Sequence, residues 1–77
     1  MKAQTIEEMT KQYCIEQINF AIAEQKRGAN SSAEETLRMA YGALDFVLSK
    51  ISNSSELTIW WNKEMFPITA KIMQNKY

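Results

Sequence analysis

Hydrophobic residues recur at helical spacing in three segments of this chain, and each segment carries two apolar stripes instead of one. The segment 31–52 shows this most clearly, because Met39, Ala43 and Phe46 follow i, i+4, i+7 spacing on a second face. A surface helix of a small protein needs about one stripe, roughly 100° wide. We therefore predict that the protein contacts a copy of itself or a partner. The first stripe of this segment consists of Leu37, Ala40, Leu44, Val47, Leu48 and Ile51.

The first predicted helix covers residues 5–27. Thr5 followed three residues later by Glu8 fits a capping box, and Gly28 supplies the left-handed residue that ends a helix. Its apolar residues cover more than half of the helix surface and fall into three groups. These are Ile6, Met9, Tyr13 and Phe20, then Cys14, Ile18 and Ala21, and finally Ile15 with Ile22.

The second predicted helix covers residues 32–52. Ser32 and Glu35 form a second capping box after a short turn at Gly28. Gly42 interrupts the helix between small residues, at a cost of roughly 0.5–1 kcal/mol relative to alanine. It is either a tolerated glycine or part of a smooth strip that another backbone could approach.

The third predicted helix covers residues 54–75 and begins at a cluster of cap residues, Asn53 to Ser55. Pro67 lacks an N–H group and crowds the preceding turn, so we expect one helix kinked at this residue. The fold class is therefore all-α, with a single helical domain over residues 1–77. We expect an oligomeric small antiparallel three-helix bundle, or a helical hairpin plus the kinked third helix. One stripe contains Leu57, Trp61, Met65, Ile68 and Ile72, and the other contains Ile59, Phe66, Ala70 and Met73.

Composition argues against an enzyme. The 77 residues include no histidine and one aspartate, Asp45, so the commonest general base and metal ligand is missing. Cys14 lies on an apolar face without a basic partner, which favours a core residue over a nucleophile. Adjacent carboxylates such as Glu7 and Glu8 diverge by about 100° and suit helix capping rather than acid–base catalysis. We predict no catalytic residues, no cofactor and no metal site.

Two other functions compete with protein binding. A helix-turn-helix regulator would need a basic face, but the polar residues of the third helix are scattered and the formal net charge is zero, so nucleic acid is not an expected partner. A small ligand could bind at an oligomer interface near Tyr13, Tyr41, Trp60 and Lys63, although their spacing does not require it. No apolar run approaches the roughly 20 residues of a membrane span, and the polar start is unlike a secretory signal. We expect a cytoplasmic protein without a membrane partner.

The sequence thus predicts a homodimeric interaction module that serves as an adaptor, inhibitor or regulatory protein. A composition rich in Ile, Asn and Lys suits an AT-rich genome, and one specific version is a phage or mobile-element inhibitor of a host system. Trp61 is expected in the core, while Trp60 is either the core rim or part of a binding patch with Pro67. The predicted interface residues are Met39, Ala43, Phe46, Ile15, Ile22, Trp60 and Phe66.

Overall fold

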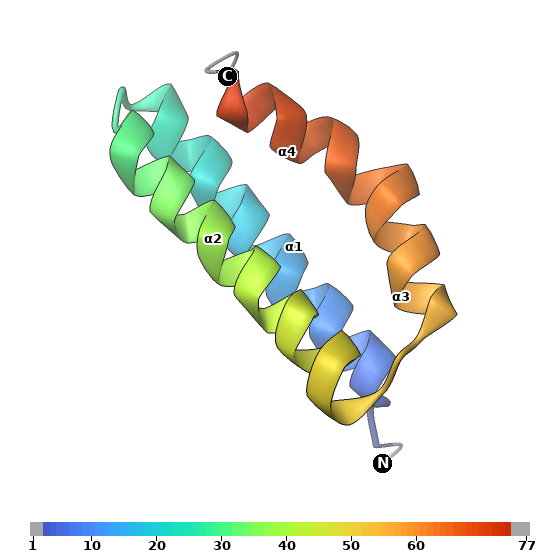
Figure 1. Cartoon of the computed structure of the whole chain (residues 1–77). Helices are drawn as coiled ribbons and strands as arrows, with labels where there is room; N and C mark the ends of the chain where they lie inside the picture. Colours follow the sequence, from blue (N-terminus) through green and yellow to red (C-terminus); the bar gives the residue numbers. More distant parts are fainter. Residues whose placement is uncertain (1–2, 75–77) are drawn as a thin grey trace.

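The computed structural model describes residues 3–74, and all regular structure within that range is helical (Figure 1). The helices form three rods, because the π-helical turn η1 continues α2 to its end and the π-helical turn η2 joins α3 to α4. The first rod is α1, the second is α2 with η1, and the third rod is α3, η2 and α4. The all-α class is confirmed. In chain order the elements are α1 (Ile6–Lys26), α2 (Asn30–Phe46), η1 (Val47–Ile51), α3 (Ser55–Trp60), η2 (Trp61–Met65) and α4 (Phe66–Met73).

The first two rods form a helical hairpin, and the third rod lies along one side of it (Figure 1). α2 runs back beside α1 after a tight turn. The third rod then returns, so that α4 ends near the hairpin turn and α3 lies near the open end of the hairpin. The hairpin therefore has one side covered by the third rod and one side facing away from it.

The predicted signals at both ends of α1 are confirmed. The Glu8 backbone N–H donates to Thr5 Oγ1 at 3.1 Å, and the Thr5 N–H donates to Glu8 Oε1 at 3.2 Å. At the other end Gly28 has φ +84° and its N–H donates to the Gln25 carbonyl at 2.9 Å. This left-handed residue reverses the chain toward α2.

The predicted capping box at Ser32 is wrong. α2 already begins at Asn30, its N-cap residue is Ala29, and no side chain caps it. The Ala29 carbonyl accepts the Ala33 N–H at 3.0 Å, so Ser32 already lies inside the first turn and is exposed. The turn at Gly28 redirects the backbone into helical geometry two residues earlier than the side-chain pattern suggests.

The end of the second rod also differs from the regular helix predicted to residue 52. Residues Val47–Ile51 form a π turn, which ends with the Ser52 N–H donating to the Val47 carbonyl at 2.8 Å. A π turn holds an extra residue, so the side chains toward its end rotate out of phase with the preceding helix. Ile51, predicted in the core stripe, is consequently 51% exposed.

The third rod begins as predicted at a cap residue, with the Leu57 N–H donating to Ser54 Oγ at 3.2 Å. A π turn at Trp61–Met65 ends two residues before Pro67, where we expected a kink in a regular helix. Proline has no N–H to donate and its ring displaces the carbonyl four residues earlier, so the widened turn accommodates it. α4 ends at Met73, and residue 75, the predicted end, lies outside the described residues.

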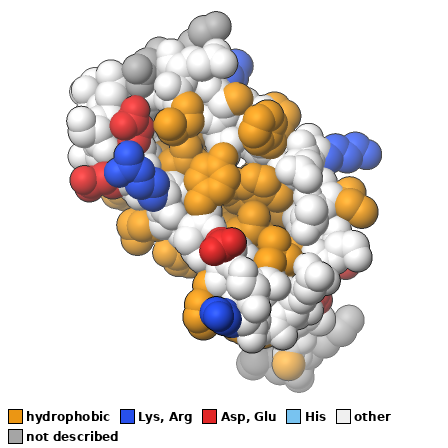
Figure 2. All heavy atoms as spheres, viewed as in Figure 1, with side chains coloured by type: hydrophobic (Ala, Val, Ile, Leu, Met, Phe, Trp, Pro, Cys, Tyr) orange, Lys and Arg blue, Asp and Glu red, His pale blue; other side chains and the backbone are white. Residues whose placement is uncertain are grey.

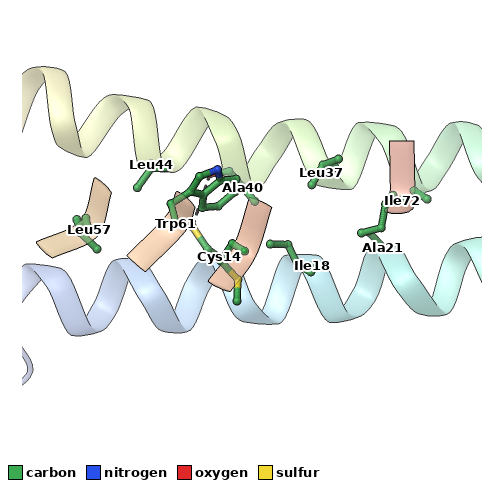
Figure 3. Close-up of a cluster of buried hydrophobic side chains, with 11 residues drawn as sticks. Cys14, Ile18, Ala21, Leu37, Ala40, Leu44, Leu57, Trp61 and Ile72 are labelled. Atoms are coloured by element: carbon green, nitrogen blue, oxygen red, sulfur yellow. Dashed lines mark hydrogen bonds between the residues drawn. The ribbon is translucent and has the colours of Figure 1, made fainter. Parts of the chain in front are cut away.

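The core forms where the three rods meet, as Figure 3 shows. Each rod turns one of its predicted stripes inward, and the second stripes stay largely at the surface. The prediction that Cys14 and Trp61 are core residues is confirmed. The buried hydrophobic residues are Cys14, Ile18, Ala21, Ala33, Leu37, Ala40, Leu44, Leu57, Trp61, Met65 and Ile72.

Candidate functional site

Two polar contacts identify which flank of α1 faces each neighbouring rod. Thr36 Oγ1 donates to Glu24 Oε1 at 2.6 Å, so the Glu24 flank faces α2. Lys11 Nζ lies 3.0 Å from Glu56 Oε2, so the Lys11 flank faces α3. These contacts fix the positions of the remaining exposed residues of α1.

Three large apolar side chains of α1 lie around the Glu24 flank. At about 100° per residue, Tyr13 lies about 20° and Phe20 about 40° from Glu24, with Met9 slightly farther round. All three are exposed. They therefore border α2 on the side of the hairpin that faces away from the third rod.

Ile15 and Ile22, both predicted interface residues, lie on the opposite flank of α1. They fall about 40° and 20° from Lys11 at the usual helical rotation. Ile22 packs partly buried against the core, and Ile15 is exposed. The structure therefore does not bring these two residues together with Met39 and Phe46.

The second stripe of α2 lies on the same side of the hairpin as the exposed residues of α1. Ala43 falls about 20°, Met39 about 60° and Phe46 about 80° from Thr36 at 100° per residue. Ala43 is partly buried, whereas Met39 and Phe46 are exposed. Apolar side chains are visible along the margin of α2 that lies away from α4 (Figure 2).

We call this combined surface the hairpin face. The thiol of Cys14 contacts the Ala40 carbonyl at 3.6 Å, which together with the Glu24–Thr36 contact sets the register of the two helices. That register places Tyr13 roughly level with Ala43. The hairpin face consists of Met9, Tyr13, Phe20, Met39, Ala43 and Phe46.

A second apolar surface lies between α2 and α4. The Tyr41 ring centroid is 4.9 Å from that of Trp61, and the Tyr41 hydroxyl donates to Thr69 Oγ1 at 3.3 Å. Phe66 and Met73 lie one turn before and after Thr69, on its α2 side, and both are exposed. We call Tyr41, Phe66 and Met73 the seam, where apolar side chains gather between the two helices (Figure 2). The predicted interface residue Phe66 belongs to the seam and not to the hairpin face.

Trp60 is partly buried at the edge of the core, on the α1 side of the third rod. Its ring meets that of Trp61 edge-on at 6.2 Å, and Lys11 Nζ lies 5.8 Å from its centroid. The ammonium group covers part of the indole through a cation–π contact. This position separates Trp60 from both exposed apolar surfaces.

Sequence reasoning did not identify the buried polar side chains that connect the rods. Gln25 Nε2 donates to the Ile72 carbonyl at 2.7 Å, which joins α1 to α4. Each buried side-chain nitrogen or oxygen in the described range has a hydrogen-bond partner. A signal was present, because Gln25 follows Ala21 and Thr69 follows Met65 at i+4, in the phase of the core stripe. The buried polar residues are Thr10, Glu24, Gln25, Thr36 and Thr69.

Cys14 is a free cysteine, and it is buried in the core. Burial raises the pKa of the Cys14 thiol to about 11, which keeps it protonated and a poor nucleophile near neutral pH. Residues 3–74 contain no cluster of three or more metal-ligating side chains and no pocket. No helix in that range is both long and apolar enough to span a membrane.

Comparison with protein-family models, curated proteins and solved structures finds no match to this chain.

Proposed function

We propose that this chain is a small non-enzymatic protein-interaction module that works as a homo-oligomeric adaptor, inhibitor or regulatory protein. The observation that supports it is the exposure of large apolar side chains on adjoining helices. Phe46 is 58%, Phe20 57% and Met39 53% exposed, on one side of the hairpin. Monomeric proteins rarely leave contiguous apolar patches beyond a few hundred Å² in contact with water.

The size of the chain supports self-association. On folding, a 77-residue protein buries a smaller fraction of its surface than a larger protein does, and its stability is correspondingly marginal. Binding a partner only in the folded state adds to the free energy of unfolding by mass action. An oligomer would therefore cover apolar surface and stabilise the fold together.

The test is the native molar mass of the wild-type chain, measured by light scattering after size exclusion over a dilution series. We expect about twice 8.9 kDa at high concentration, falling toward the mass of one chain on dilution. Apolar association should persist in high salt, because ionic screening weakens charge pairs and not hydrophobic contacts. A single-chain mass at every concentration would contradict self-association.

A further inference from the structure

We propose that the hairpin face binds the hairpin face of a second copy of this chain, so that two α1–α2 hairpins pack face to face while the seam remains exposed. This inference rests on the proposed function and specifies the partner and the surface. The hairpin face is on the opposite side of α1 and α2 from the third rod, so a second copy can approach it without displacing α3 or α4 (Figure 1).

The area of the hairpin face fits a dimer. Its five large side chains are each between 37% and 58% exposed. With about 200 Å² per large side chain, this leaves roughly 500 Å² of apolar surface on each copy. A standard interface buries about 800 Å² per partner, of which about 65% is apolar in homodimers. The hairpin face therefore supplies approximately the apolar area that a stable homodimer buries, whereas the seam has only three such side chains.

The charge distribution also fits a second copy. The centre of the hairpin face, around Tyr13, Gln17 and Ala43, carries no charged side chain. Glu16 and Glu35 fall at its outer margins, where an interface rim stays solvated. In a two-fold contact the residues near the symmetry axis meet their own copies, so a charged centre would repel itself. The formal net charge of zero likewise removes repulsion between whole chains.

The shape of the face allows interlocking. Met39, Ala43 and Phe46 follow the alternating four- and three-residue spacing of helices that pack side by side. The short side chain of Ala43 leaves a depression (the low point) in the surface between the longer side chains of Met39 and Phe46. In a two-fold interface each copy offers both the low point and the long side chains that can fill the partner's low point.

Phe46→Glu and Phe66→Glu form a matched pair of variants that test this surface. Phe46 is 58% and Phe66 is 54% exposed, so the same substitution is made at two equally exposed positions on different surfaces. We expect Phe46→Glu to raise the dimer dissociation constant about 100-fold or more, because it places a carboxylate in the apolar contact of both copies. Phe66→Glu should change it by no more than about threefold. The measurement is the light-scattering dilution series, with far-UV circular dichroism to show that each variant folds.

Phe20→Glu provides an independent check from the other helix of the hairpin face. It should also weaken the dimer at least about tenfold, since Phe20 is 57% exposed on the same surface. The inference would be overturned if the wild-type chain is a dimer that Phe66→Glu dissociates while Phe46→Glu and Phe20→Glu leave it intact. The proposed function would still stand in that case. A wild-type chain that is monomeric throughout would instead remove the self-association on which both depend.

Discussion

The hairpin and the third rod are packed with different kinds of side chain. The α1–α2 pair has small residues in its buried face, and small side chains let two helix backbones approach closely. Such an approach requires regular helices, and α1 and α2 are uninterrupted over their whole contact. The small buried residues of the hairpin are Cys14, Ala21, Ala33 and Ala40.

The third rod reaches the hairpin with long side chains and tolerates irregular backbone. A π turn and Pro67 interrupt it, yet its large residues still fill the space between α1 and α2. Polar contacts such as Gln25 to the Ile72 carbonyl hold it in place. The comparison teaches that long side chains can compensate for an uneven helix, whereas closely packed helices depend on regular geometry. The large buried hydrophobic residues of this rod are Leu57, Trp61, Met65 and Ile72.

The largest expected effect on stability comes from removing Trp61, the large buried aromatic side chain of the third rod. Trp61 is 5% exposed and touches Tyr41, so Trp61→Ala should lower the free energy of unfolding by about 3–5 kcal/mol. Trp60→Ala is the control, because Trp60 is only partly buried and should lose less than half as much. Urea unfolding followed by circular dichroism measures both. Equal losses would contradict the different roles assigned to the two tryptophans.

Ala40→Leu tests whether the hairpin depends on close approach. Ala40 is fully buried and its carbonyl accepts the Cys14 thiol, so a longer side chain must push the two helices apart. We expect a loss of about 1–3 kcal/mol in the free energy of unfolding from overpacking. Ala23→Leu places the same substitution at an exposed position of α1 and should change stability by less than about 0.5 kcal/mol. If both variants unfold at the same urea concentration, the hairpin is not closely packed at Ala40.

Substitution of the two glycines by alanine should change the free energy of unfolding in opposite directions. Gly28 has φ +84°, where a side chain is strained, and Gly28→Ala should lose about 1–2 kcal/mol. Gly42 lies inside α2 with nothing within 4 Å of an added Cβ, and Gly42→Ala should gain about 0.5–1 kcal/mol. Thermal unfolding of the two variants, at a concentration where each is monomeric, checks both signs. A stabilising Gly28→Ala would show that the turn into α2 does not need its left-handed residue.

Patterns of residues close in sequence predict several features of the fold correctly. The cap at Thr5, the stop at Gly28 and the inward stripe of the second rod as far as Leu44 all depend on residues close in sequence, and the structure confirms them. The sequence also distinguishes Trp61 from Trp60, because adjacent helical residues point about 100° apart, and the structure buries only Trp61 fully in the core.

Features that depend on contacts between rods were not predicted. The π turns and the buried Glu24–Thr36 pair arise from how distant segments fit together, which helical spacing alone does not specify. For the same reason the sequence groups Ile15 with Met39, although the structure places Ile15 on the flank of α1 that faces away from the hairpin face. The candidate site was therefore predicted in its α2 part, while its α1 part required the observed orientation of the hairpin.

The two π turns also determine where this chain should tolerate the deletion of a single residue. Each is geometrically a regular helix with one residue inserted, so a single deletion can be absorbed there without moving the helix before it. The two positions are not equivalent. Deleting a residue from η1 would restore a regular helix at the end of the second rod, whereas deleting one from η2 would bring the ring of Pro67 against the carbonyl of the preceding turn. Length variants of this protein should therefore be tolerated at Val47–Ile51 and rejected at Trp61–Met65.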